Sequence, residues 1–158
     1  MSAVFPSLRP PLRPSVLLLM LAGVSVAAIG VYFLLLRPPL LPEDLRFLHM
    51  SEAGLAAGAP RLTSWLSNVF RVLGGYALAT GLLGIALGAT AYRRRDPLAV
   101  AGAIAAGLSG IGLMSATNFA IGSDFRWVLL GLALLWAASL LCLALEARGR
   151  PANPRQRN

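Results

Sequence analysis

Four long apolar runs constrain this chain more than any other feature of its sequence. They cover residues 16–36, 65–92, 98–118 and 126–145. Each meets or exceeds the roughly 20 residues that a helix needs to cross ~30 Å of hydrocarbon. Lipid cannot satisfy exposed backbone groups, so such runs cross it as α-helices. The sequence therefore predicts an all-α fold: an integral membrane four-helix transmembrane bundle formed by residues 15–147.

The segments outside the runs are short. Residues 1–14 alternate prolines with arginines and predict a flexible basic arm, and residues 148–158 predict a disordered basic tail. Between the first two runs, Pro42 precedes two acidic residues, which is typical of a helix start. We therefore expect a short interfacial helix over residues 42–50, followed by a Gly- and Ala-rich turn over residues 52–60.

The arginines indicate how the bundle is oriented. All 14 Lys+Arg residues are arginine, and most stand at the ends of apolar runs. Arg93–Arg95 and the arginines of both termini would share one side, whereas the other two connectors carry balanced charge. The positive-inside rule then places both termini in the cytoplasm of a bacterial inner membrane, with residues 40–63 facing outward. We expect no nucleic-acid partner, because the arginines stand at the ends of apolar runs and no base-reading motif accompanies them.

Small residues recur along the second and third runs. Three- and four-residue spacing allows helix backbones to approach closely where lipid provides no hydrophobic drive for association. We therefore expect the second helix to pack against the third through two faces, formed by Gly81, Gly84 and Gly88 and by Gly102, Ala106 and Gly110.

Polar residues gather at the predicted outward-facing mouth of the bundle. Ionisable groups near membrane depth are candidates for function, and bundle cores commonly bind ligands. The candidate ligand-binding residues are Glu43, Asp44, His49, Asn68, Arg71, Asn118, Asp124 and Arg126. A structural alternative is open for Arg71, which can extend to lipid phosphate or pair with Asp124 across the bundle.

Several function classes lack the residues that they need. The middle of each run has no carboxylate, lysine or histidine, which argues against an ion-coupled transporter. His49 is the only histidine, so neither a metal site nor a bis-His haem is expected. Cys142 stands alone, which excludes a thiol redox pair. No nucleophile-elbow, zinc-protease or phosphate-loop motif is present, and we expect no cofactor.

Short motifs resemble those of small bacterial four-helix membrane proteins of a loosely DoxX-like kind. They are Arg71-Val-Leu-Gly-Gly-Tyr76 followed by Gly81-Leu-Leu, Leu41-Pro-Glu-Asp-Leu-Arg46, and Asn118 with Asp124-Phe-Arg-Trp127. The resemblance covers residues 35–145 and implies a four-helix inner-membrane fold. DoxX itself is associated with respiratory or redox membrane complexes, so an accessory role is implied, without any assigned site residue.

These observations favour a non-enzymatic, multi-pass membrane protein in contact with the bilayer. We expect an accessory or structural subunit of a membrane complex, with a membrane protein or a second copy as partner. The alternative is a binder or carrier of a small lipophilic or anionic ligand at the outward-facing mouth. A further alternative is a membrane enzyme that uses Glu43, Asp44 or His49.

Overall fold

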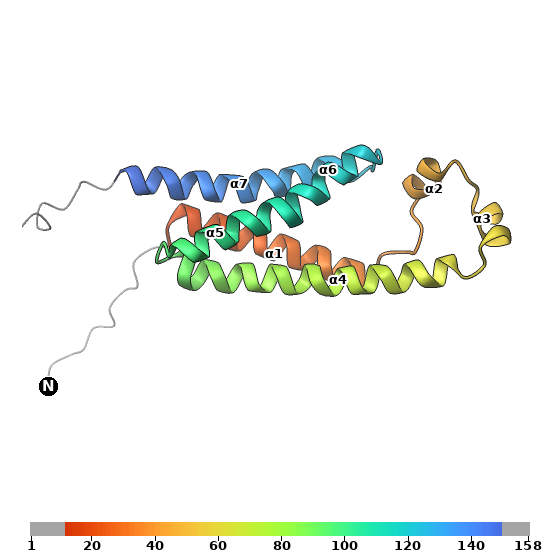
Figure 1. Ribbon diagram of the computed structural model, residues 1–158, viewed down its shortest axis with the longest axis horizontal. Coiled ribbons are helices and arrows are strands. Elements are labelled where there is room, and N and C mark those ends of the chain that lie inside the picture. The colour runs from red at the N-terminus through yellow and green to blue at the C-terminus, as the bar shows by residue number, and fades with distance from the viewer. Residues whose placement is uncertain (1–11, 150–158) are drawn as a thin grey trace, which may run out of the picture.

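A computed structural model of the chain describes residues 12–149 (Figure 1). The predicted arm (residues 1–14) and tail (residues 148–158) therefore lie almost wholly outside the described residues.

Four helices are long and apolar enough to cross a membrane, which confirms the predicted all-α four-helix fold. Their ends lie within one helical turn of those predicted. Two of them contain a π-helical segment, in which the backbone is locally wound more widely. The elements are α1 (Pro14–Leu35); α4 (Leu62–Leu87) with η1 (Gly88–Tyr92); α5 (Pro97–Ala106) with η2 (Gly107–Gly112) and α6 (Leu113–Ala120); and α7 (Arg126–Arg148).

The connector between α1 and α4 contains two short helices. The first, α2 (Pro42–Leu48), begins where predicted and ends at His49, whose left-handed φ of 52° terminates it. The second, α3 (Glu52–Gly58), corrects the predicted Gly- and Ala-rich turn. The Ser51 hydroxyl accepts a hydrogen bond from the Gly54 amide at 3.1 Å and caps this helix. Alanine has the strongest helix propensity, so a capped Ala-rich segment favours a helical turn here.

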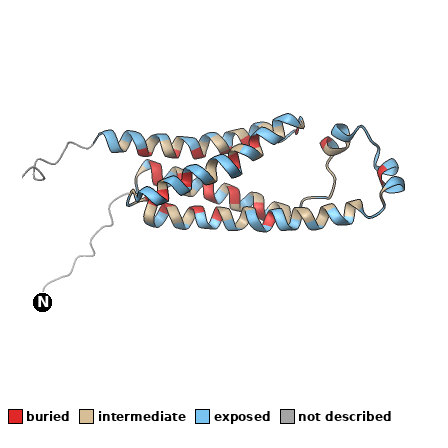
Figure 2. Cartoon of the chain, viewed as in Figure 1, coloured by how far each residue is buried: buried red, intermediate tan, exposed pale blue. Residues whose placement is uncertain are grey.

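The long helices run alternately up and down, with α1 packed against both α4 and α7 (Figure 1). The ends of the described chain lie at the same end of the bundle, beside Arg93–Arg95, which we call the arginine end. The opposite end carries α2, α3 and the α6–α7 turn, and we call it the α2–α3 end. Buried positions lie on the facing sides of the helices (Figure 2), whereas large apolar side chains such as Leu83 and Leu98 are exposed on the outer faces, as lipid contact requires.

Close packing in this bundle occurs between α1 and α4. A Cβ atom on Gly30 would collide with the Leu78 backbone, and one on Gly81 would collide with the Ala27 backbone. Both glycines are buried. Gly81 therefore lies at a close helix–helix approach, but the neighbour is α1.

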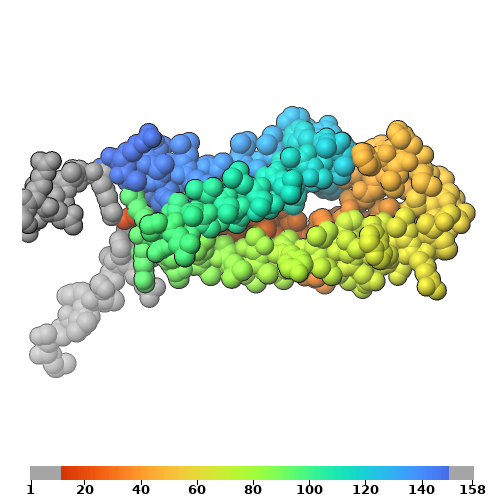
Figure 3. All heavy atoms as spheres, viewed as in Figure 1, coloured from red at the N-terminus to blue at the C-terminus, as the bar shows by residue number. Residues whose placement is uncertain are grey.

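The predicted pairing of the second helix with the third is wrong. A Cβ on Gly102 or Gly110 would meet nothing within 4 Å, and Gly88 faces Met20 of α1. Gly84 and Ala106 line a groove of about 460 Å³ between α4 and α5. Figure 3 shows the second and third long helices separating toward the α2–α3 end, with α1 visible between them.

Trp136 of α7 explains why this groove stays open. It is buried, and its indole N–H donates to the Ala103 carbonyl at 2.9 Å. A Cβ on Gly107 would lie only 2.6 Å from the indole nitrogen. On the third helix, Gly107 therefore makes room for a tryptophan of α7. The sequence predicted that small residues of this helix approach the second helix.

Buried and half-buried polar groups join three helices at the arginine end. The Glu146 carboxylate accepts hydrogen bonds from the Ser15 amide at 3.1 Å and the Ser15 hydroxyl at 2.9 Å. Arg95 pairs with the same carboxylate at 3.3 Å. Beneath them, the Tyr92 and Ser139 hydroxyl groups lie 2.8 Å apart. This network fixes the ends of α1, η1 and α7 relative to one another.

Candidate functional site

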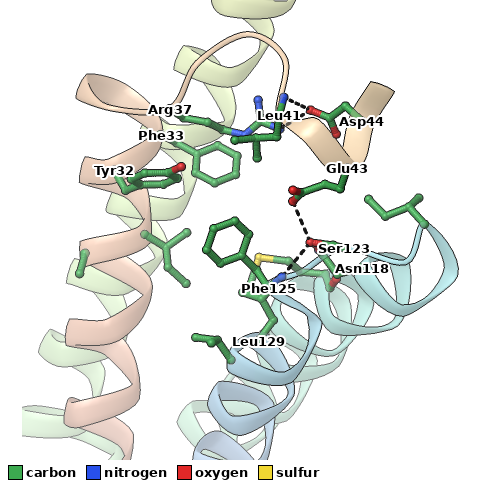
Figure 4. A pocket seen from close by; sticks show the side chains of 15 residues that line it. Tyr32, Phe33, Arg37, Leu41, Glu43, Asp44, Asn118, Ser123, Phe125 and Leu129 are labelled. Carbon is green, nitrogen blue, oxygen red and sulfur yellow. Dashed lines mark hydrogen bonds and ion pairs between the residues drawn. The ribbon is translucent and has the colours of Figure 1, made fainter. Parts of the chain in front are cut away.

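A cavity of about 360 Å³ lies at the α2–α3 end, where α6 and the first turns of α7 diverge from α1 (Figures 1 and 4). The short helix α2 covers its outer side. Four parts of the chain line it: α1 and the residues after it with Ala28, Ile29, Tyr32, Phe33, Arg37 and Leu41; α2 with Glu43 and Asp44; α6 with Met114 and Asn118; and the segment into α7 with Ile121, Ser123, Phe125, Val128 and Leu129.

The sequence after α1 places α2 over this cavity. Pro38 and Pro39 disfavour helical continuation of α1. The chain then turns, and Leu41 precedes α2 in an extended conformation. The Asp44 carboxylate accepts the Leu41 amide at 2.8 Å and so satisfies a donor at the start of the helix. Prolines and a capping carboxylate together determine where α2 begins.

Arg37 is the most enclosed cation of the site. Its guanidinium carbon lies 3.4 Å from the ring centroid of Phe70 and 5.2 Å from that of Phe33. Its Nη2 is 3.3 Å from the Asp44 carboxylate, and its side chain is only 7% exposed. Burial lowers the pKa of Arg37, and the neighbouring Asp44 carboxylate opposes that shift. An arginine remains charged under such conditions, so Arg37 and Asp44 form a charge-matched pair.

Glu43 is the buried carboxylate of the site. The residue is 5% exposed, and its Oε1 accepts the Ser123 hydroxyl at 3.1 Å. The Ser123 oxygen in turn accepts the Phe125 amide, also at 3.1 Å. Within residues 12–149 no hydrogen bond reaches Glu43 Oε2, yet this atom is not fully enclosed. Figure 4 shows the carboxylate directed from α2 into the cavity.

Aromatic and aliphatic side chains form most of the remaining wall. Tyr32, Phe33 and Phe125 face the space in front of Glu43 (Figure 4). Asn118 donates its amide to the Met114 carbonyl of its own helix at 2.8 Å, which leaves its side-chain oxygen as an acceptor. The cavity is thus an apolar chamber with its polar groups concentrated toward α2.

The structure brings together only part of the predicted polar cluster. Glu43, Asp44 and Asn118 line the cavity, and the other candidates do not. His49 is exposed at the end of α2, and Asn68 and Arg71 are exposed on α4.

The remaining two candidates hold the α6–α7 turn. Asp124 pairs with Arg46 of α2, whose Nη2 lies 2.8 and 2.9 Å from its two oxygens. The predicted alternative partner, Arg71, is not the one observed. Arg126 donates to the Gly122 and Ser123 carbonyls, each at 3.3 Å, and so closes the end of α6.

Sequence reasoning missed Arg37, Tyr32, Ser123 and Phe125. In the sequence, Arg37 indicates only the end of a helix, because two prolines follow it. The available signal is its spacing from Phe33, because residues four apart lie on the same helix face. Ser123 and Phe125 occupy a turn, and no local pattern distinguishes a turn serine that contacts a distant carboxylate.

One carboxylate that lines the cavity has no ion-pair partner in the described part of the chain. Arg37 pairs with Asp44, whereas Glu43 is hydrogen-bonded to the neutral Ser123 hydroxyl and feels Arg37 and Arg46 only through space. Residues 12–149 contain no group of three or more His, Cys, Asp and Glu side chains placed to hold a metal ion. The arrangement suits an apolar molecule that carries a hydrogen-bond donor or a positive charge.

No protein-family model, curated protein or solved structure matches this chain.

Proposed function

We propose that this multi-pass membrane protein binds a small lipophilic molecule in the cavity covered by α2. The observation that carries the proposal is the cavity of about 360 Å³, with aromatic and aliphatic walls and a few polar groups at one end. Sites for small molecules in proteins have this size and this composition. Of the two ligand types expected from the sequence, the lipophilic one is favoured.

The anionic ligand expected from the sequence is not supported by the charges at the cavity. Arg37 is paired with Asp44, and one face of its guanidinium is covered by Phe70. The Glu43 carboxylate would repel an anion. Arg71 and Arg126, the expected anion contacts, do not line the cavity.

Photo-labelling with a neutral aryl-diazirine tests this function. The protein in lipid nanodiscs is irradiated with the probe, and the labelled peptides are mapped by mass spectrometry. We expect labelling concentrated in residues 28–44 and 114–129. Ala28→Phe fills the cavity from α1 without removing a polar group and should suppress this labelling. Ala79→Phe adds the same bulk to the exposed face of α4 and should not. Labelling spread evenly over all four helices would refute the proposal.

An accessory role in a larger membrane complex is a second proposal. Its support is that Gly102 of α5 and Gly110 of η2 have no neighbour within 4 Å of an added Cβ, although small residues in membrane helices are typical of helix interfaces. Native mass spectrometry after gentle extraction should then show a reproducible protein partner, and a bare monomer would count against it. Of the residues expected for the enzymatic alternative, Glu43 and Asp44 line the cavity and His49 does not, and that alternative stays a prediction.

For the location, we propose a bacterial inner membrane with the arginine end in the cytoplasm. The support is the distribution of charge. At the α2–α3 end the arginines are accompanied by Glu43, Asp44, Glu52 and Asp124, whereas at the described arginine end only Asp96 and Glu146 accompany Arg13, Arg93–Arg95 and Arg148. A membrane-impermeant thiol reagent applied to intact cells of a Cys142→Ser background should label Ser51→Cys and spare Gly149→Cys. The reverse result would invert the topology.

A further inference from the structure

Resting on the proposed function, we infer that the molecule bound in this cavity carries a cationic head, an amine or a quaternary ammonium, placed against Glu43. Three features of the cavity favour such a head: a carboxylate without an ion pair among the described residues, the aromatic rings in front of it and an Arg37 that is already paired with Asp44.

The first feature is the incomplete pairing of Glu43. A carboxylate removed from water is costly unless it is paired with a positive charge or fully hydrogen-bonded. Glu43 is 5% exposed, and its one side-chain partner within residues 12–149 is the neutral Ser123 hydroxyl. Its Oε2 is not fully enclosed and opens on the cavity, and no ion pair engages this carboxylate within residues 12–149. A cation in the cavity would supply the opposite charge.

The second feature is the aromatic wall. Tyr32, Phe33 and Phe125 surround the space into which Glu43 projects (Figure 4). The faces of aromatic rings attract cations, and rings of this kind recognise quaternary ammonium groups. Phe33 already contacts the Arg37 guanidinium at 5.2 Å, so Tyr32 and Phe125 are the rings open to a ligand. A carboxylate that shares a cavity with these rings favours a cation over a neutral group of the same size.

The third feature explains why Arg37 does not repel such a ligand. Its Nη2 bonds to Asp44, its Nη1 donates to the Pro38 carbonyl at 3.0 Å, and Phe70 covers one of its faces. Its charge is thus matched within the protein, at the rim formed by α1 and α2. Glu43 contributes its own negative charge to the interior of the cavity.

The test compares three probes of matched shape by calorimetry in zwitterionic nanodiscs, with empty nanodiscs subtracted. They are a phenylalkyl-trimethylammonium ion, its neutral analogue with carbon in place of nitrogen, and a phenylalkyl sulfonate. We expect the cation to bind about tenfold or more tightly than the neutral analogue, since attraction to the Glu43 carboxylate and to the aromatic rings acts only on the charged probe. The sulfonate should bind most weakly.

Two substitutions assign the preference to the cavity. Glu43→Gln should abolish the preference for the cation while the neutral analogue still binds. Glu52→Gln removes an exposed carboxylate on α3, outside the cavity, and should leave the preference intact. Phe125→Leu keeps the buried carboxylate and provides a second measurement if Glu43→Gln does not fold. It should weaken the cation about two- to fivefold relative to the neutral analogue.

The outcomes separate this inference from the function on which it rests. Equal binding of cation and neutral analogue, or a preference that survives both Glu43→Gln and Phe125→Leu, would overturn the cationic head and leave a lipophilic binding site. If none of the three probes binds, both the inference and the proposed function fail.

Discussion

The guanidinium of Arg37 lies 3.4 Å from the ring centroid of Phe70 while its Nη2 is 3.3 Å from the carboxylate of Asp44. Arg37 follows α1, Phe70 belongs to α4 and Asp44 to α2. A single side chain thus joins three elements at the edge of the cavity. The contact connects α2 to α1 and α4 at this edge of the cavity.

Replacing Arg37 with lysine should loosen α2. An ammonium group keeps the charge but loses the planar contact with Phe70 and the fixed direction of the bond to Asp44. We expect a loss of about 2 kcal/mol in the free energy of unfolding, as for a desolvated cation–π contact. Hydrogen exchange over residues 42–48 should become faster. Arg46→Lys, at an exposed position on α2, is the matched control and should leave exchange nearly unchanged.

Glu146→Gln should destabilise the arginine end. The neutral amide keeps one acceptor for Ser15 but loses the charge that pairs with Arg95 and with the amino end of α1. We expect a loss of about 1–3 kcal/mol, measured by unfolding in mixed micelles. Ser15→Ala removes only the hydroxyl bond and should be milder. A Glu146→Gln protein as stable as the parent would show that the carboxylate contributes nothing to stability.

Gly30→Ala and Gly102→Ala should behave in opposite ways. The added methyl group would overlap the Leu78 backbone at Gly30 but meet nothing within 4 Å at Gly102. The first change must separate α1 from α4, and we expect a loss of about 1–3 kcal/mol from overpacking. The second should be neutral or stabilising, because alanine favours the helix. Equal destabilisation in a thermal melt would contradict the observed packing.

The Arg46–Asp124 pair should contribute little and depend on salt. Its two side chains are 58% and 62% exposed, and exposed ion pairs are weakened by water and screened by salt. A double-mutant cycle with Arg46→Gln and Asp124→Asn should give a small coupling energy that vanishes in high salt. A large, salt-independent coupling would mean that this pair, and not the Arg37 contact, holds α2 in place.

The four-helix fold could be predicted because hydropathy and length depend only on local sequence. The helix partners could not. Glycines such as Gly81 and Gly102 indicate that a backbone can be approached, but they do not specify the neighbour. Gly23 and Gly30 of α1, and the bulk of Trp136, determine that α4 packs on α1 and remains apart from α5.

The candidate site was predicted only in part, because local sequence indicates polar residues but not the residues that they contact. Glu43, Asp44 and Asn118 were found because polar residues near an apolar run stand out. Arg71 stood out in the same way and lies on an exposed face. Arg37 was overlooked, because its role depends on Phe70, which is distant in the sequence. Pairings between distant residues, such as Glu43 with Ser123, require the folded chain.

The contact between Glu146 and Ser15 has a consequence for biosynthesis. The two residues are 131 positions apart, so the first helix enters the membrane long before its capping carboxylate has been translated. At ~5–20 residues per second, that interval is on the order of ten seconds. During this time the Ser15 amide and hydroxyl must rely on water or lipid headgroups. Completion of the last helix therefore secures the first, and a nascent chain that stops before Glu146 carries an unfinished amino end.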